Sequence, residues 1–128
     1  MIDPRLSPFA RMLAIEIAED GPPLVLRMPY RPFMIGAPER LHGGVVAGLM
    51  ELASSTALAR ALEGSDARFK PISVTVDYLR AGAPADCLAE ARIIRLGRRI
   101  ANIECHAWQD DRSRPIAAAR MNLLIDRG

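Results

Sequence analysis

The stretch "HGGVVAGLMELASSTALA", His42 to Ala59, decides the fold of this 128-residue chain. Nearly every position in it is apolar or small, and Glu51 is the only charged residue between Gly43 and Ala59. The stretch predicts one long helix that begins near residue 42 or 43 and runs to about residue 62, where Gly64 suits a C-terminal cap. A helix that is apolar on almost every side must be enclosed by other elements.

Shorter stretches on both sides of the predicted helix have patterns typical of strands. Before it stand the alternating residues 13–17 and "LVLRMPY" at 24–30, and after it stand "PISVTVDYL", "CLAEARIIRL", "RRIANIECHAWQ" and "PIAAARMNLLI". The last three are separated only by "GR" and "DDRSR", and such short turns indicate antiparallel neighbours. The sequence therefore predicts an α+β fold, in which a curved antiparallel sheet wraps around one long central α-helix.

Composition excludes several classes of protein. The length fits one domain, residues 1–128, in which residues 1–12 form a lead-in segment. A net charge of +2 and 5% aromatic residues give no reason to expect a nucleic-acid partner. The chain has no stretch of 18 uncharged apolar residues and no N-terminal signal pattern, so we expect no membrane partner and a cytoplasmic location.

The sequence also gives no sign of a metal site or a cofactor. Cys87 and Cys105 do not form a CxxC pair, and no His/Cys cluster has metal-ligand spacing. We expect both cysteines to be reduced, buried and structural.

The two sides of the predicted helix differ in the size of their residues. On the side of Glu51 most residues are small, and they are Gly44, Ala47, Gly48, Ser54, Ser55 and Leu58. The far side, which we expect to pack on the sheet, is bulkier and comprises Val45, Val46, Leu49, Leu52, Ala53 and Thr56. Burying Glu51 without a partner would cost many kcal/mol, so we expect its burial to have a functional reason.

Gly48 points to a close neighbour of this helix. Glycine inside a helix costs roughly 1 kcal/mol relative to alanine, which indicates that another helix or a ligand approaches the backbone there. The plain alternative is a helix–helix contact in which an arginine neutralises Glu51. A symmetric dimer with a ligand slot beside the contact fits better.

The "HGG" at 42–44 predicts a site at the start of the helix. Two glycines there leave backbone N–H groups open to an incoming oxygen at the positive end of the helix dipole, as in an oxyanion hole. His42 and Glu51 are nine positions apart, roughly 13 Å along the axis and on opposite faces. If the Gly43 N–H and the Glu51 carboxylate act on one carbonyl, they must come from two antiparallel chains.

Several segments together resemble a known family. "PFARMLAIEIAEDG", "LHGGVVAGLMELASS", "VTVDYLRAG" and "RIIRLGRRIANIECHAW" occur in the same order as in the PaaI-like branch of the hotdog-fold acyl-CoA thioesterases. The resemblance covers about residues 9–125. It implies a hotdog fold, two chains that pair into one continuous sheet, and active sites at the dimer interface.

The resemblance also implies roles for individual residues. His42 and Gly43 would open the helix at the thioester, with the Gly43 N–H as oxyanion donor, and Glu51 would occupy the acidic catalytic position. Ser55, one turn on, would hold the water or the carboxylate. Relatives commonly carry Asn or Gln six residues before the histidine, whereas this chain has Gly36, so the side-chain polariser is missing or comes from elsewhere.

Four arginines around the predicted turn at 97–98 form a basic patch: Arg92, Arg95, Arg98 and Arg99. One reading is that they form a solvated strand face. The other is that one or two of them bind the phosphates of coenzyme A, and Arg98 and Arg99 are then the first candidates. Asp77 and His106 lie in predicted strands and are weaker candidates for catalysis.

The predicted function is hydrolysis of small or medium aliphatic, or arylacyl, CoA thioesters to the free acid and CoA. Glu51 would act as base or nucleophile, opposite the Gly43 N–H of a partner chain in a homodimer or homotetramer. A hydratase of the same fold is a rival, but its "GHFP"-type loop and its aspartate-to-histidine pair are both absent. A non-catalytic acyl-CoA-binding or structural hotdog module remains the alternative because of Gly36.

Overall fold

The computed structural model describes residues 7–128. Its elements, in chain order, are α1 (Pro8–Met12), β1 (Glu16–Asp20), β2 (Leu24–Met28), the 3-10 helix η2 (Pro32–Met34), α2 (Gly43–Ala61), β3 (Arg68–Tyr78), β4 (Cys87–Leu96), β5 (Ile100–Trp108) and β6 (Ala117–Asp126). Every predicted strand has a counterpart, although β1 begins three residues later than the predicted strand at 13–17, and α2 agrees with the predicted helix to within one residue at each end. Half of the expected lead-in segment, residues 1–6, lies outside the described residues.

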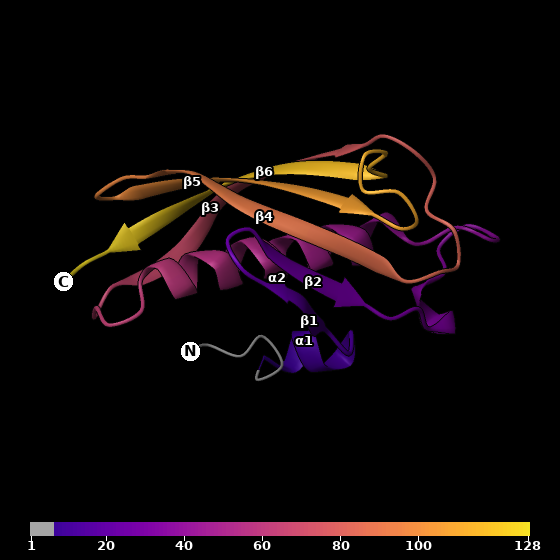
Figure 1. The fold of residues 1–128 in the computed structure, drawn as a ribbon, viewed down its shortest axis with the longest axis horizontal. Helices are drawn as coiled ribbons and strands as arrows, with labels where there is room; N and C mark the ends of the chain where they lie inside the picture. Colours follow the sequence, from indigo (N-terminus) through magenta and orange to yellow (C-terminus); the bar gives the residue numbers. More distant parts are fainter. Residues whose placement is uncertain (1–6) are drawn as a thin grey trace.

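The six strands form one antiparallel sheet in the order β1-β2-β4-β5-β6-β3. The sheet curves along α2, with strands β4 to β6 on one side of the helix and the β1–β2 hairpin and α1 on another (Figure 1). The short turns join neighbouring strands as expected. β3 instead pairs with β6 at the far edge, so the chain crosses the sheet between β3 and β4. The predicted α+β architecture is confirmed.

Helix α2 packs on β2, β4, β5 and β6, but the predicted division into two sides is only partly right, because Gly48, Ser54 and Leu58 of the Glu51 side are buried as well. Of the residues expected on the bulkier side, Val46, Leu49, Ala53 and Thr56 are buried, whereas Val45 and Leu52 are only half-buried. The helix ends at the C-cap Leu62, and Gly64 follows with φ of +85°. This left-handed conformation suits glycine, as the sequence predicts.

The close neighbour of Gly48 is α1 of the same chain. A Cβ added at Gly48 would lie 2.7 Å from Cζ of Phe9, so the ring of Phe9 rests directly on the helix backbone. A side chain at position 48 would require the ring of Phe9 to move. Of the two neighbours that the sequence left open, a helix or a ligand, the structure shows a helix.

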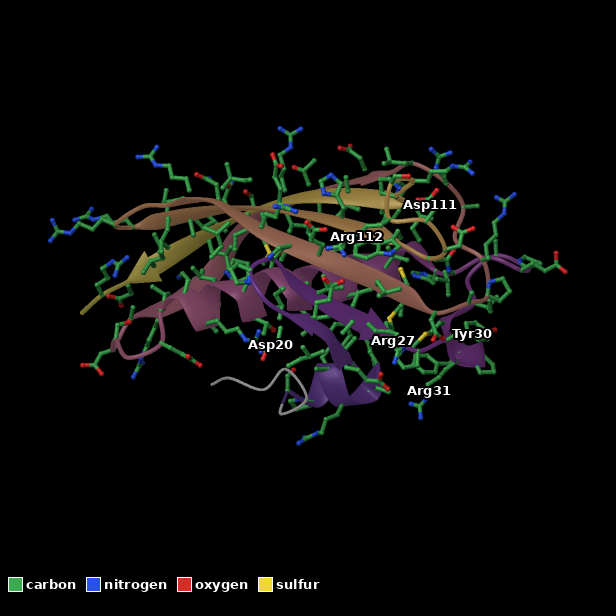
Figure 2. The ribbon with its side chains drawn as sticks, in the orientation of Figure 1. Asp20, Arg27, Tyr30, Arg31, Asp111 and Arg112 are labelled. Carbon is green, nitrogen blue, oxygen red and sulfur yellow. The ribbon has the colours of Figure 1, made fainter. Side chains whose placement is uncertain are left out.

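The face of the sheet away from α2 is partly covered by the loop between β5 and β6. Arg112 of this loop lies beside β4 and β5 (Figure 2), with its guanidinium 4.8 Å from the ring centroid of Trp108. The same side chain donates to Glu90 at 2.7 and 3.0 Å and to Glu19 at 2.8 Å. Arg112 therefore ties the loop to β1 and β4.

The two cysteines are free and buried, as expected. Burial raises the pKa of both thiols to about 12, which keeps them protonated and unreactive. Within residues 7–128, no helix combines the length and apolar character that crossing a membrane requires.

Candidate active site

The chain before α2 folds into a compact loop that delivers His42 to the start of the helix. Its two ends meet in an isolated bridge between Ile35 and Leu41. The N–H of His42 donates to the Met34 carbonyl at 2.7 Å, and the N–H of Leu41 donates to the Gly82 carbonyl at 3.0 Å. The first turn of α2 is thus fixed from both sides.

His42 is the N-cap of α2. Its backbone is extended, and its Nδ1 accepts a hydrogen bond from the N–H of Gly44 at 2.8 Å. Because Nδ1 is the acceptor, the ring proton of the neutral imidazole is on Nε2. The His42 carbonyl accepts from Val45 and Val46. His42 therefore accepts hydrogen bonds from the three N–H groups of the first turn that follow Gly43.

The N–H of Gly43 is the donor of the first turn that His42 does not bind. Within residues 7–128 no acceptor pairs with it, and it stands at the positive end of a 19-residue helix. An unpaired N–H at such a helix end attracts a negatively charged or polarised oxygen. The "HGG" motif predicts an oxyanion donor here, and the use of this N–H by a substrate stays a prediction.

Tyr78, at the end of β3, is a residue that the sequence analysis did not assign to the site. Its hydroxyl donates to the Gly43 carbonyl at 3.0 Å, and a Cβ at Gly43 would lie 3.0 Å from its ring. The two residues, with Arg40 and Arg80, help to line a cavity of about 450 Å³. One signal for Tyr78 was present in the sequence. The strand pattern alternates, and it puts the tyrosine on the same face as Val74 and Val76.

Glu51 is exposed in the single chain. The prediction that its carboxylate is buried is therefore wrong for one chain alone. The sheet covers only one side of α2, and the five-residue α1 reaches Gly48 but leaves Glu51 open. The alternative of an ion pair is not seen either, since no arginine or lysine within residues 7–128 pairs with Glu51. Ser55, one turn further on, is half-buried.

Within one chain the candidate residues form two separate groups. His42 and Gly43 lie together at the start of α2, while Glu51 is eight residues from Gly43, or about 12 Å along the helix axis. Gly36 belongs to the first group, because a Cβ at position 36 would lie 3.0 Å from Cα of His42. Position 36 is therefore close enough to the helix start to influence it, but here it offers no side chain.

The other candidates lie on strands or turns away from α2. Asp77 and His106 alternate with core-facing neighbours, so both side chains leave the sheet on the face opposite the helix. Arg92 is paired with Glu90 at 2.5 Å. Arg98 and Arg99 are exposed at the β4–β5 turn and line a second cavity. In the described part of the chain, no group of three or more His, Cys, Asp or Glu residues could hold a metal ion.

Comparison with known proteins identifies the family. Residues 31–124 match the family model described as "Acyl-CoA thioesterase N-terminal domain". The chain belongs to this acyl-CoA thioesterase family. A solved structure described as a protein from the thioesterase superfamily is 30% identical, with 96% of this chain and 92% of that chain covered and a TM-score of 0.85. The thioesterase likeness thus extends over nearly the whole chain, and the predicted hotdog fold is confirmed.

More distant structures share this fold. One is a thioesterase from Haemophilus influenzae, at 24% identity, 92% and 82% coverage and a TM-score of 0.84. Another is a putative thioesterase, a phenylacetic acid degradation-related protein from Ralstonia eutropha, at 18% identity, 92% and 90% coverage and a TM-score of 0.83. No match was found among curated proteins.

Proposed function

We propose that this protein hydrolyses acyl-CoA thioesters, small or medium aliphatic or arylacyl, to the free acid and CoA. The observation that carries the proposal is the unpaired N–H of Gly43 at the start of α2, in a chain of the acyl-CoA thioesterase family. A Bacillus halodurans protein of the same fold, at 19% identity, has a structure described as "with CoA". That description supports CoA as the carrier of the acyl group.

The Gly43 N–H holds the thioester oxygen as negative charge develops on it. The fixed helix start suits this task, because the donor needs no rearrangement during the reaction. His42 acts through the backbone: by accepting from Gly44, it orients the first turn and leaves the Gly43 N–H available. It is a positioning residue in this scheme.

Glu51 supplies the second half of the chemistry. As a general base it removes a proton from water, which attacks the carbonyl carbon. The tetrahedral intermediate then collapses, the C–S bond breaks and CoA leaves as the thiol after protonation. As a nucleophile the carboxylate would attack the carbon itself, the C–S bond would break to release CoA as the thiolate, and water would then hydrolyse the resulting anhydride. Ser55, one turn away, holds the water or the carboxylate.

The site requires two chains. The 12 Å between Gly43 and Glu51 in one helix prevents both from reaching one carbonyl, whereas two antiparallel helices bring Glu51 of one chain opposite Gly43 of its partner. An exposed carboxylate in the single chain is consistent with a group that becomes enclosed only on dimerisation. We therefore propose a homodimer, or a tetramer built from such dimers.

Release of free thiol from a panel of aliphatic and arylacyl-CoA esters tests the proposal. Replacing Glu51 with Gln should lower kcat by at least about 100-fold, because the base or nucleophile is lost while the shape is kept. Asp77→Asn and His106→Ala are matched controls, since both side chains lie on the opposite face of the sheet. Thiol release by Glu51→Gln at the parent rate would refute the role of Glu51.

The glycine at position 36 favours a second candidate function, the binding of acyl-CoA without hydrolysis. The position is next to His42 but offers no side chain that could polarise a thioester. A chain that binds acyl-CoA without hydrolysing it would explain this feature. Tight binding of acyl-CoA with no thiol released over hours would favour the binding module over the enzyme.

A further inference from the structure

An exposed aromatic ring stands on the turn of α2 that precedes Glu51. Phe9 of α1 meets the helix with its Cζ and Cε2 atoms, which would lie 2.7 and 2.9 Å from a Cβ at Gly48. Phe9 is nevertheless 42% exposed, so much of its ring remains open. Met12 is 52% exposed, and residues three apart on a helix share a face. Helix α1 therefore presents an apolar surface, formed by Phe9 and Met12, alongside α2.

This apolar surface has a fixed place on α2. Ala10 and Leu13, the neighbours of Phe9 and Met12 on α1, are fully buried in the core. The hydroxyl of Ser7 caps the start of α1 by accepting from the N–H of Ala10 at 3.4 Å. On α2, the glycine beneath the ring costs roughly 1 kcal/mol relative to alanine, and its missing Cβ is what allows the ring to lie so close.

The apolar surface adjoins the carboxylate of Glu51. Gly48 and Glu51 are three positions apart on α2, and Cβ positions at this spacing are about 5–6 Å apart. Side chains of an α-helix lean toward its N-terminus, so Glu51 leans back over the turn that contains Gly48. The ring and the carboxylate thus share one patch of α2, and both are exposed. A group bonded to a carbon that the carboxylate can reach would meet the ring of Phe9.

We propose that Phe9 is a wall of the acyl site, where it contacts the acyl group of a thioester whose carbonyl carbon faces Glu51 of the same chain. The inference rests on the proposed thioesterase function and deepens it, because it identifies a residue that discriminates among acyl groups. An aromatic acyl group gains edge-to-face or offset contact with the ring, and a longer aliphatic group gains burial. The methyl group of an acetyl thioester is too short to gain either.

Binding of two thioether analogues of CoA, phenacyl-CoA and acetonyl-CoA, tests the wall. They differ only in a phenyl or methyl group on the ketone carbon, and neither can be hydrolysed as a thioester. In isothermal titration calorimetry the wild type should prefer phenacyl-CoA. Phe9→Leu keeps an apolar side chain on Gly48 but removes the ring, so the ratio of the two Kd values should fall by about five- to ten-fold.

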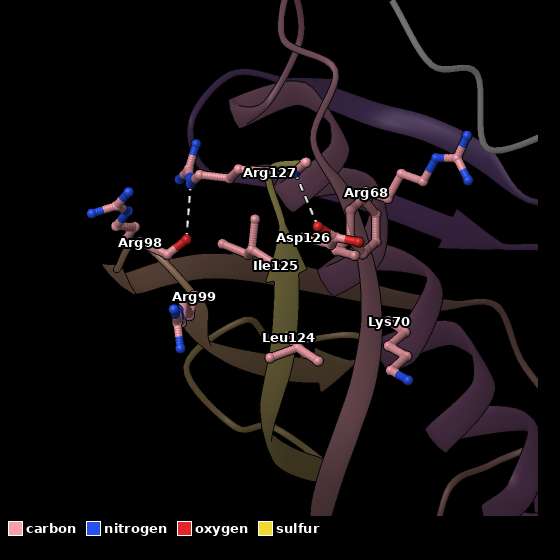
Figure 3. Close-up of a pocket in the computed structure, with 10 residues that line it drawn as sticks. Arg68, Lys70, Arg98, Arg99, Leu124, Ile125, Asp126 and Arg127 are labelled. Carbon is pink, nitrogen blue, oxygen red and sulfur yellow. Dashed lines mark hydrogen bonds between the residues drawn. The ribbon is translucent and has the colours of Figure 1, made fainter.

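Two further variants separate contact with the acyl group from general damage. Gly48→Ala keeps Phe9 but forces its ring to move, so the preference should fall again. Figure 3 shows Arg98 at the β4–β5 turn, with its side chain pointing away from β6. Any contact of Arg98 with the analogues would involve the CoA part that they share, so Arg98→Ala should leave the ratio unchanged. A preference that survives in both Phe9→Leu and Gly48→Ala would overturn the wall.

Mixed dimers test whether Phe9 serves Glu51 of its own chain. When Gly43→Pro and Glu51→Gln are refolded together, the intact site of the mixed dimer takes its Glu51 from the Gly43→Pro chain. Adding Phe9→Leu to that chain should lower kcat/KM for phenylacetyl-CoA relative to acetyl-CoA several-fold. Adding it to the Glu51→Gln chain should leave this ratio unchanged, and the reverse pattern would overturn the assignment.

The binding measurement does not depend on turnover, so the two proposals can fail separately. Loss of the analogue preference in Phe9→Leu, without thiol release from any ester by the wild type, would leave the wall in place and refute the proposed function. Thiol release by the wild type, with the same analogue preference in the wild type, Phe9→Leu and Gly48→Ala, would refute the wall and leave the proposed function in place.

Discussion

Among single residues, the proposed reaction depends most directly on the backbone N–H of Gly43. Proline is accepted at the first position of a helix and lacks this N–H, and His42 already has the extended backbone that a following proline requires. Gly43→Pro should therefore lower kcat by about 100-fold or more, as loss of an oxyanion donor does. Thiol-release kinetics measure the effect.

Gly43→Ala is the matched control for this substitution. It places the same Cβ against the ring of Tyr78 but keeps the N–H. We expect a much smaller loss of kcat than in Gly43→Pro. Equal losses in the two variants would mean that crowding of Tyr78, and not the missing donor, causes the effect.

Glu90 makes the stability of the fold depend on pH. Burial alone would raise its pKa, but hydrogen bonds from Arg112 and Arg92 outweigh burial and hold the pKa below its usual 4.5. The ionised carboxylate therefore stabilises the fold at pH values above 4.5. This stabilisation is lost as the pH falls through the lowered pKa of the folded state. Urea unfolding should show Glu90→Gln less stable by about 1–2 kcal/mol at pH 7, with the difference shrinking below pH 4.5.

The exposed pair of Glu16 and Arg27 provides the comparison for Glu90. Their side chains meet at 2.9 Å but are about half exposed, so Glu16→Gln should change the unfolding free energy by less than about 1 kcal/mol. A Glu90→Gln variant that is as stable as the wild type at pH 7 would contradict the role assigned to the Glu90–Arg112 pair.

Between elements, the packing of α1 on α2 can be tested at Gly48. Alanine is the better helix former by about 1 kcal/mol, yet its Cβ would meet the ring of Phe9 at 2.7 Å. Gly48→Ala should therefore destabilise the wild type, whereas in a Phe9→Ala background the same change should be neutral or stabilising. Urea unfolding of the two single variants and the double variant measures this coupling.

The secondary structure could be predicted because it depends on local patterns. The alternation in β3 to β6 and the apolar run of α2 are visible in the sequence. The pairing of β3 with β6 could not be predicted, because it joins residues 39 to 58 positions apart and leaves no local signal. The same limit applies to Phe9, whose contact with Gly48 was predicted only as an unspecified close neighbour.

At the candidate site, the sequence predicts open N–H groups at both glycines of the "HGG" motif. The N–H of Gly44 is capped by His42, whereas that of Gly43 has no acceptor among residues 7–128, and its role as oxyanion donor stays a prediction. The exposure of Glu51 could not be deduced from helix periodicity, because it depends on how far the sheet and α1 extend around α2. Tyr78 was visible in the strand pattern but carried no sign that its hydroxyl reaches Gly43.

For the whole molecule, the edge strand β3 is the expected dimer interface. Ile72 and Val74 are 55% and 44% exposed on this unpaired edge, which favours pairing with a second copy. The double variant Ile72→Lys/Val74→Lys should sediment as a monomer and lose thiol release together with dimerisation. A monomeric variant with full activity would show that one chain suffices.

The central claim is that Glu51 of one chain acts with Gly43 of another. Glu51→Gln and Gly43→Pro, each inactive alone, should recover thiol release when unfolded together and refolded as a 1:1 mixture, because each mixed dimer contains one intact site. With random pairing the mixture should reach about a quarter of the wild-type activity. Activity that stays at the level of the separate variants, in a mixture shown to contain mixed dimers, would contradict a site shared between chains.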